Sequence, residues 1–340
     1  MVERGTRGKT AEAEEVQPPE AVEFPTWERR HVLDLDDFSR REIEQVMETA
    51  EAMKEVLGRE IRRVPTLRGT IVATLFYETS TRTRSSFELA AKALGADVIS
   101  VAAAASSVQK GETLVDSART LQAIGANILV MRHRQSGAPY LVAAHVDMSV
   151  INAGDGWHAH PTQGLLDAYT IQHHLGDLRG KKVVIVGDIL HSRVARSNIW
   201  GLTTMGAQVV LCGPPTLLPW GLRPGYRGDE EKAMPPVEVD TNLDRAIEGA
   251  DVVMTLRLQL ERQQAGLLPS LREYIRLYQV NEERLARAKP NAPVMHPGPI
   301  NEGIEVSPAV AHGARSVIEE QVANGVAVRM ALLYLLAKGR

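Results

Sequence analysis

Residues 76–88 read Phe-Tyr-Glu-Thr-Ser-Thr-Arg-Thr-Arg-Ser-Ser-Phe-Glu, and they join an apolar, β-branched run to a helical pattern. The stretch therefore predicts a strand, a turn and a helix. The turn holds hydroxyl and guanidinium donors at Ser80, Thr81, Arg82 and Thr83. Free N–H groups and the macrodipole already favour an anion at a helix N-terminus. With the added donors, the turn predicts a phosphate site rather than a simple N-cap beside solvated arginines.

Strand and helix patterns alternate along most of the chain. Apolar runs predict strands at Ile71–Phe76, Asp97–Val101, Asn127–Met131, Ser149–Asn152, Lys182–Val186, Gln208–Leu211, Asp251–Thr255 and Pro293–Met295. Helices are predicted at Trp27–Leu57, Ser85–Leu94, Thr113–Ile124, Pro139–His145, Pro161–Leu175, Ser192–Met205, Leu243–Glu248 and Val317–Lys338. This alternation predicts an α/β fold with parallel sheets that helices cover on both faces.

A chain of 340 residues is long enough for two such domains. The helix at Pro161–Leu175 would bridge them, and the long C-terminal helix would pack back on the first domain. We expect a disordered tail at residues 1–25, a first domain at 26–162 completed by 312–340, and a second domain at 163–311. The tail is rich in Glu, Arg, Gly and Pro and could also be an interaction arm.

Composition excludes several classes of function. The net charge is −3 and no block of Lys and Arg appears, so neither a nucleic-acid partner nor a membrane surface is predicted. A single cysteine, Cys212, excludes a disulfide framework and a cysteine-based metal site. It fits the reducing cytoplasm, which is the location we expect. We see neither a signal peptide nor an apolar stretch of membrane-spanning length.

Four further polar clusters follow predicted strands, where open α/β sheets bind ligands. The clusters contain Arg132; then His160, Thr162 and Gln163; then Arg193; and finally Arg257 and Gln259 with the turn at residues 296–299. A neutral histidine at a helix N-terminus can polarise a carbonyl oxygen. His158 and His160 have no carboxylate or cysteine spaced to complete a metal site, so neither a metal nor a cofactor is predicted.

The sequence contains no Ser-His-Asp triad, glycosidase carboxylate pair or Walker loop. What remains is a set of cations and neutral donors. Such a set suits substrates with several negative charges and a reaction that needs electrostatic stabilisation rather than a covalent nucleophile.

The strings Ser80-Thr-Arg-Thr-Arg84, Ser86-Phe-Glu88 and His160-Pro-Thr-Gln163, in this order and spacing, resemble the aspartate/ornithine carbamoyltransferase superfamily. The resemblance covers roughly residues 30–340. It implies transfer of a carbamoyl group from carbamoyl phosphate to an amine without a metal, and it makes the first domain the carbamoyl phosphate-binding one.

The resemblance also implies roles for individual residues. Ser80, Thr81, Arg82 and Thr83 would hold the phosphate. Arg132 and His160, with Thr83, would polarise the carbamoyl oxygen. Gln163 and the carbonyls of Gly298 and Pro299 would hold the carbamoyl NH₂. Ser106 and Lys110 match a mobile loop that reaches a neighbouring subunit's site, which implies a homotrimer with shared active sites. Arg82, Thr83, Arg132, His160 and Lys110 are the expected catalytic residues. Glu78 matches a carboxylate that helps to hold the closed state.

The acceptor amine depends on the carboxyl half. Ornithine enzymes typically have an Asp-x-x-x-Ser-Met-Gly loop and a His-Cys-Leu-Pro string, and this sequence has neither. Its strings Arg257-Leu-Gln259 and His296-Pro-Gly-Pro299 are instead similar to the aspartate enzymes. Arg193 and Arg257 would clamp the two carboxylates of aspartate, with Gln259 and Lys110 as further donors. The second domain would then bind aspartate. The product would be N-carbamoyl-L-aspartate, formed in pyrimidine biosynthesis.

Two alternatives stay open at this point. One is a carbamoyltransferase for another amine, such as ornithine, and the other is a non-catalytic paralogue that binds a ligand or a partner enzyme. A regulatory chain or a dihydroorotase-like protein is a possible partner.

Overall fold

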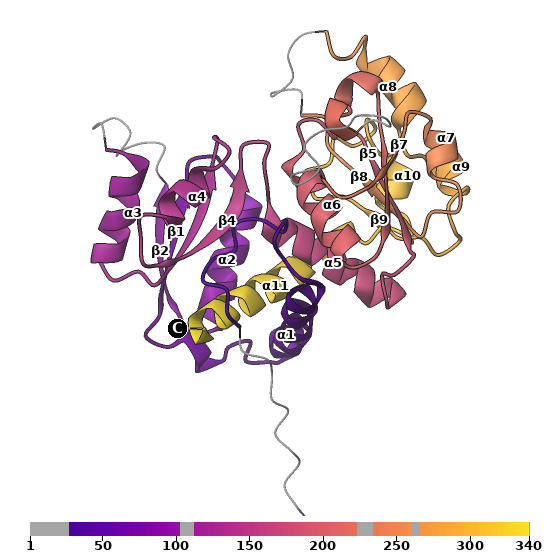
Figure 1. Ribbon diagram of the computed structural model, residues 1–340. Coiled ribbons are helices and arrows are strands. Elements are labelled where there is room, and N and C mark those ends of the chain that lie inside the picture. The colour runs from indigo at the N-terminus through magenta and orange to yellow at the C-terminus, as the bar shows by residue number, and fades with distance from the viewer. Residues whose placement is uncertain (1–26, 103–111, 223–233, 260–265, 340) are drawn as a thin grey trace, which may run out of the picture.

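The first half of the chain forms a four-stranded parallel sheet. The computed structural model describes residues 27–102, 112–222, 234–259 and 266–339. The strands are β1 (Ile71–Phe76), β2 (Asp97–Ala102), β3 (Ile128–His133) and β4 (Ser149–Asp155), in the order β2-β1-β3-β4. The helices of this half are α1 (Arg40–Gly58), α2 (Thr81–Ala93), α3 (Leu114–Ala123) and α4 (Ala138–Ala143), and a 3₁₀ turn lies at Pro65–Leu67. Figure 1 shows this half in indigo and purple.

The second half forms a five-stranded parallel sheet. Its strands are β5 (Lys182–Val186), β6 (Gln208–Cys212), β7 (Glu238–Asp240), β8 (Val252–Thr255) and β9 (Val294–Met295), in the order β7-β6-β5-β8-β9. Its helices are α6 (Arg193–Thr204), α7 (Leu243–Ala246), α8 (Leu271–Tyr278), α9 (Glu282–Leu285) and α10 (Pro308–Ala311), with 3₁₀ turns at Pro215–Leu217 and Trp220–Leu222. The predicted pair of parallel sheets is confirmed.

Alternate residues of each strand enter different cores, because successive side chains point to opposite faces of a sheet. In β1, Val72 belongs to a cluster with residues of α1, α2 and α11, whereas Ala73 packs with residues of α3 and α4. In β5, Val183 belongs to the same large cluster as Val72, whereas Val184 packs with residues of α7 to α10. Both faces of both sheets are therefore covered, which explains why the strands read as unbroken apolar runs.

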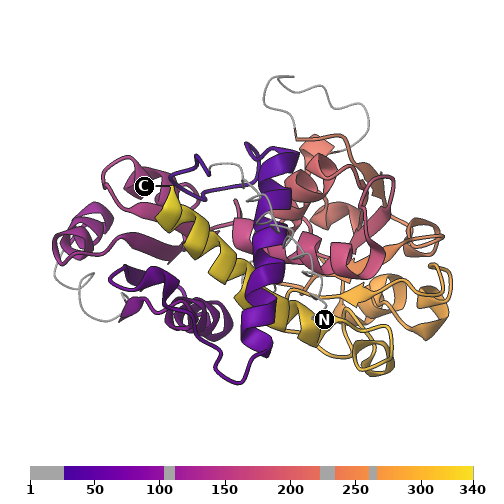
Figure 2. The same cartoon turned by 90° about the horizontal axis from the view of Figure 1, so that it is seen from below.

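Two helices join the halves. α5 (Pro161–Leu175) follows β4 after a short loop and contacts α6 of the second half. α11 (Ile318–Lys338) starts beside β9 and packs against α5, α1 and α2. Figure 2 shows α11 in yellow, crossing α1 on its way from the second half to the first. The predicted bridging helix and the returning C-terminal helix are confirmed.

The first helix is shorter than the predicted Trp27–Leu57. Ser39 caps α1 through a capping box with Glu42, and the helix starts at Arg40. The chain before it is extended at Val32 instead. The backbone of Val32 lies beside β4 and hydrogen-bonds to Val150 and Asn152 of that strand. The buried apolar side chains before α1 gave a pattern that fits a helix as well as an edge segment.

The helix after β1 starts earlier than the predicted Ser85. Ser80 is its N-cap and α2 begins at Thr81. This first turn lines a cavity rather than the core, so its polar residues gave no helical periodicity. β7 and the helices α8, α9 and α10 were not predicted.

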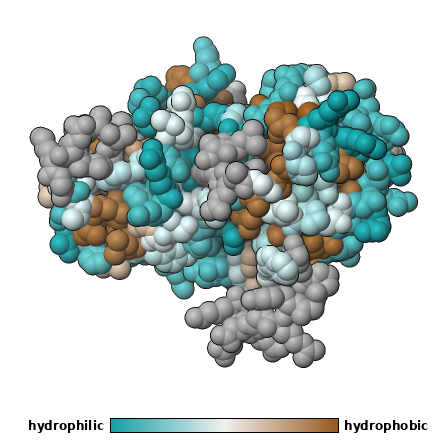
Figure 3. Space-filling model, turned by 90° about the horizontal axis from the view of Figure 1, so that it is seen from above, coloured by the Kyte–Doolittle hydropathy of each residue, from teal (hydrophilic) through white to brown (hydrophobic). Residues whose placement is uncertain are grey.

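In the described part of the chain, no helix has both the length and the apolar character needed to cross a lipid bilayer. The face drawn in Figure 3 is largely hydrophilic, and its apolar residues form separate patches. Cys212 lies buried in β6, where burial raises the pKa of its thiol to about 12.

Candidate active site

A cavity of 660 Å³ lies where the carboxyl ends of the two sheets face each other. Segments after β1, β3 and β4 line it from the first half, and segments after β5, β8 and β9 line it from the second. The described lining residues include six arginines but a single carboxylate, that of Glu78. The arginines are Arg82, Arg132, Arg134, Arg193, Arg257 and Arg329. The cavity therefore favours ligands that carry several negative charges.

The N-terminus of α2 supplies the anion-binding part of the cavity. Ser80, Thr81, Arg82 and Thr83 all line it. Ser80 is the N-cap, but its side chain makes no capping bond, so the first turn directs both N–H groups and hydroxyls to the cavity. Arg82 and Arg257 line the same cavity, and burial, with the charge of Arg257, lowers the pKa of Arg82. Both effects are relieved by a bound anion.

Glu78 connects the two halves of the site. Its Oε2 accepts a hydrogen bond from Arg132 Nε at 3.0 Å and another from Arg193 Nη2 at 2.9 Å. Arg132 also donates to the carbonyl of Ala153, and Arg193 donates to that of Gly156. These contacts fix the two guanidinium groups, since planar donors with several partners lose little freedom on binding a ligand.

His160 is the buried N-cap residue of α5. Its backbone N–H donates to Ser197 Oγ at 2.9 Å, and its Nδ1 lies 3.4 Å from Thr162 Oγ1. Burial, with the charges of Arg132, Arg193 and Arg329, lowers its pKa well below the usual range. A neutral imidazole keeps one N–H to polarise a carbonyl oxygen and does not add to the positive charge.

The turn at residues 296–299 closes the opposite side of the cavity. His296 Nδ1 accepts the N–H of Gly298 at 2.7 Å, and its Nε2 lies 3.1 Å from Glu305 Oε1. Gly298 has a φ of +66°, and a Cβ there would come within 2.6 Å of Arg82 Nη1. Glycine thus serves two purposes here, since it adopts the left-handed conformation and lets Arg82 approach.

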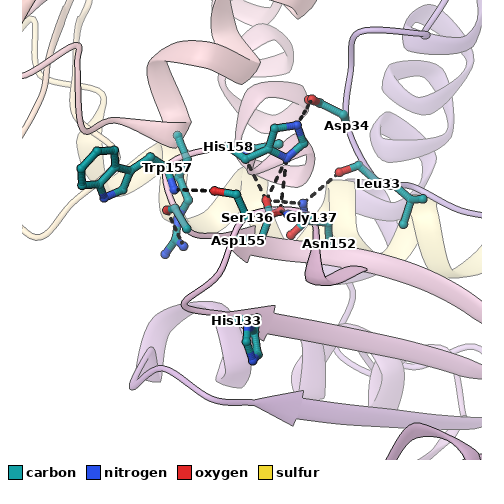
Figure 4. Close-up of polar contacts among 12 residues, drawn as sticks. Leu33, Asp34, His133, Ser136, Gly137, Asn152, Asp155, Trp157 and His158 are labelled. Carbon is teal, nitrogen blue, oxygen red and sulfur yellow. Dashed lines mark hydrogen bonds and ion pairs between the residues drawn. The ribbon is translucent and has the colours of Figure 1, made fainter. Parts of the chain in front are cut away.

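The loop between β4 and α5 is anchored outside the cavity. Figure 4 shows the His158 ring between Asp155 and Asp34. His158 Nδ1 lies 3.2 Å from Asp155, and its Nε2 lies 3.3 Å from Asp34. Asp155 also accepts the N–H of Gly137 at 2.7 Å. This cluster holds the backbone that carries the Gly156 carbonyl and His160.

Two family models match the chain. The aspartate/ornithine carbamoyltransferase carbamoyl-P binding domain matches residues 30–173, and the Asp/Orn binding domain of the same family matches residues 179–336. The aspartate carbamoyltransferase catalytic subunit of Roseiflexus sp. (strain RS-1) is 63% identical over 309 residues, which are 91% of this chain and 95% of that protein.

The chain belongs to the aspartate/ornithine carbamoyltransferase family.

Other members of this family are similar in sequence or in structure. The catalytic subunit from Chloroflexus aurantiacus is 62% identical, over 91% of this chain and 98% of that protein. The aspartate transcarbamoylase of Trypanosoma cruzi, solved with carbamoyl aspartate and phosphate, superposes with a TM-score of 0.80 at 30% identity, over 92% and 99% of the chains. The ornithine carbamoyltransferase of Pyrococcus furiosus gives 0.77 at 30% identity, over 90% and 96%. The family fold is thus shared by enzymes named for different acceptors.

The structure brings most of the predicted carbamoyltransferase residues to one cavity. The lining contains the predicted Ser80, Thr81, Arg82, Thr83, Arg132, His160, Gln163, Arg193, Arg257, Gln259, Gly298 and Pro299. Ser106 and Lys110 lie outside the described residues.

Arg329 is a lining residue that the sequence reasoning missed. It is buried in α11, donates to Ser86 Oγ at 2.8 Å and has a pKa lowered by burial to about 10. A signal was present, because Arg329 interrupts an otherwise apolar helical stretch, where a charge is costly without a purpose. Arg134 was missed as well, because an arginine after a strand is usually a surface residue.

Proposed function

We propose that the protein is an aspartate carbamoyltransferase. It transfers the carbamoyl group of carbamoyl phosphate to the α-amine of L-aspartate and releases N-carbamoyl-L-aspartate and phosphate. One observation carries the proposal: a single cavity joins the N-terminus of α2 to Arg193 and Arg257 of the second half. The names of relatives that are about 60% identical over more than 90% of the chain support it.

The charge of the site suits this pair of substrates. Carbamoyl phosphate brings a phosphate dianion to Ser80, Thr81, Arg82 and Thr83. Aspartate brings two carboxylates, for which Arg193 and Arg257 are the proposed clamps, with Gln259 as a further donor. The second half offers no carboxylate to the cavity among its described lining residues, and the ammonium group of ornithine would need one.

Chemistry starts when the neutral α-amine of aspartate attacks the carbonyl carbon of the donor. The carbonyl becomes a tetrahedral oxyanion, which Thr83, Arg132 and His160 stabilise as donors. The C–O bond to phosphate then breaks, and the phosphate leaves with both electrons of that bond. Arg82 and Lys110 stabilise the leaving phosphate, which can take the proton that the amine loses.

Glu78 would couple binding to domain closure. One carboxylate oxygen bonds both to Arg132, a proposed donor to carbamoyl phosphate, and to Arg193, a proposed clamp for aspartate. We assign carbamoyl phosphate binding to residues 26–162 with 312–340, and aspartate binding to 163–311. A homotrimer, in which Ser106 and Lys110 enter a neighbour's site, is the proposed catalytic unit, and the cytoplasm is its proposed location.

A panel of amines tests the acceptor. The purified chain is incubated with carbamoyl phosphate and aspartate, ornithine, N-acetylornithine or a diamine, and phosphate release is followed. Of these amines, we expect only aspartate to give phosphate release above the background hydrolysis of carbamoyl phosphate. Release with ornithine and none with aspartate would contradict the proposed acceptor, and no release with any amine would favour a non-catalytic paralogue.

A further inference from the structure

Asp167 is a buried carboxylate of α5 that the proposed mechanism does not use. Its exposed fraction is 0%, and it lies one helical turn after Gln163. Three side-chain amides donate to it. Gln163 Nε2 and Gln321 Nε2 each lie 2.9 Å from Oδ1, and Asn198 Nδ2 lies 2.8 Å from Oδ2. The three donors come from α5, α11 and α6, so the carboxylate sits where the helices that join the two halves meet.

An ionised carboxylate can only accept hydrogen bonds, so each of the three amides must present its NH₂ end to Asp167. Burial raises the pKa of Asp167 to about 6, whereas the bonds from Asn198, Gln321 and Gln163 lower it. The group is thus mainly ionised at neutral pH. Since the NH₂ of Gln163 is held by Asp167, its Oε1 is the end that remains for the cavity, which Gln163 lines.

The same carboxylate also reaches the turn across the cavity. Gln321 donates to Asp167 and accepts the backbone N–H of His296 through Oε1 at 2.8 Å. His296 in turn accepts the N–H of Gly298. The groups proposed to accept from the carbamoyl NH₂ are the Gln163 amide and the carbonyls of Gly298 and Pro299. Asp167 therefore connects Gln163 to the turn that carries these two carbonyls.

We propose that Asp167 is a positioning residue for the transfer reaction: its carboxylate orients the Gln163 amide so that Gln163 Oε1 accepts a hydrogen bond from the NH₂ group of the carbamoyl donor. This inference rests on the proposed function. It deepens that function because it explains how the site distinguishes a carbamoyl group from an acyl group without N–H donors.

The variant Asp167→Asn tests the proposal. The NH₂ of the new amide meets Gln163 and Gln321 if it takes the Oδ1 position, and it meets only Asn198 if it takes the Oδ2 position. In the first arrangement, rotation of Gln163 relieves the conflict at the expense of the acceptor in the cavity. We expect kcat/KM for carbamoyl phosphate to fall by about ten- to hundredfold, the usual effect of one mispaired buried hydrogen bond. The Kd of inorganic phosphate, which has no NH₂, should change by less than about threefold, because phosphate binds at α2.

A double-mutant cycle with Gln163→Ala separates positioning from a general structural role. If Asp167 acts through Gln163, the loss in the double variant is smaller than the product of the two single losses. Asp167→Ser is a second variant in which the carboxylate is absent but a water can occupy its space. Asn324→Ala is the matched control. Asn324 of α11 donates to Thr170 of α5 at 3.0 Å, so it joins two of the helices that meet at Asp167, but it does not line the cavity.

The outcomes distinguish this inference from the function on which it rests. The inference is supported if kcat/KM for carbamoyl phosphate falls in both Asp167 variants while phosphate binding is unchanged, and if the effects of the Asp167 and Gln163 substitutions do not multiply. Unchanged kcat/KM in an active enzyme, losses equal to those of the Asn324 control, or effects that multiply would overturn it alone. A wild-type enzyme without carbamoyl transfer to any amine would overturn the proposed function itself.

Discussion

At the scale of single residues, the site depends on a few groups whose charge is set by burial. His160 is kept neutral by desolvation and by the surrounding arginines, while Glu78 is held between two of those arginines. This combination gives the site strong positive potential with one neutral N–H donor among the charges.

The variant His160→Ala removes one donor to the oxyanion. We expect kcat with saturating aspartate to fall on the order of 100-fold or more, since such donors act mainly in the transition state. Steady-state kinetics measure the loss, and His173→Ala on the exposed end of the same helix is the control. Near-full activity of His160→Ala would show that the role assigned to His160 is wrong.

The pH dependence of turnover offers a second check on His160. Because burial and the nearby arginines lower its folded pKa well below the ordinary value of 6.5, we expect the imidazole to stay neutral between pH 6.5 and 8. The His160→Ala variant should therefore lower kcat by the same factor across this range. A factor that shrinks steadily toward pH 6.5 would mean that the wild-type imidazole becomes protonated there.

The variant Arg257→Ala removes a proposed clamp for aspartate. We expect the KM for aspartate to rise about ten- to hundredfold, as for the loss of a charge-assisted hydrogen bond, with a much smaller effect on the KM for carbamoyl phosphate. Arg272→Ala, an exposed arginine of α8, is the control. Equal effects on both substrates would argue against a clamp for aspartate.

At the scale of elements, turns after parallel strands carry the site. The turn at residues 296–299 was recognised from its prolines, but its contact with Arg82 could not be predicted, because it depends on how the halves meet. The predicted start of α2, Ser85, is later than the observed start at Thr81 for a related reason, because the first turn of α2 faces the cavity and not the core.

The variant Gly298→Ala tests the contact between this turn and Arg82. A Cβ would displace the guanidinium group and strain a left-handed backbone by about 1–2 kcal/mol. Gly303→Ala is a matched control, because Gly303 has a φ of +83° but nothing within 4 Å of its Cβ position. We expect similar losses of stability in thermal melts, but weaker inhibition by phosphate for Gly298→Ala alone. Equal phosphate inhibition in the two variants would contradict the contact.

The cluster of His158 with Asp34 and Asp155 should make stability depend on pH. The hydrogen bond to Asp155 raises the pKa of His158, so its contribution is complete below the unfolded pKa and is lost as pH rises through the folded one. The pKa of Asp34 is raised to about 7 by burial, which acts in the same direction. His158→Ala should thus destabilise by about 1 kcal/mol near pH 6 and by less at pH 9. Denaturant unfolding measures this, and a larger loss at pH 9 would contradict it.

At the scale of the whole molecule, the sequence predicted both sheets, the bridging helix and the returning helix. Local patterns sufficed there, because strands covered on both faces read as apolar runs and α5 has clear ends at His160 and Gly176. The three amide hydrogen bonds to Asp167 and the position of Arg329 in the cavity lining could not be predicted. Each depends on helices that are far apart in sequence and meet only in the fold.

Shared active sites would appear as complementation between inactive variants. If Lys110 enters a neighbour's site, mixing Lys110→Ala and His160→Ala chains after dissociation should restore activity, because some sites would then contain both native residues. Activity of the mixed assembly is compared with that of each variant reassembled alone. No recovery in an assembly that is shown to be mixed would contradict shared sites.

The most direct test of the central claim follows the carbamoyl carbon itself. Carbamoyl phosphate labelled with ¹³C is incubated with the enzyme and L-aspartate, and the product is identified by NMR and mass spectrometry. The account predicts labelled N-carbamoyl-L-aspartate, with the carbon bonded to the α-nitrogen, and one phosphate released per product. Label that remains in carbamoyl phosphate and its hydrolysis products, or that transfers only to another amine, would contradict it.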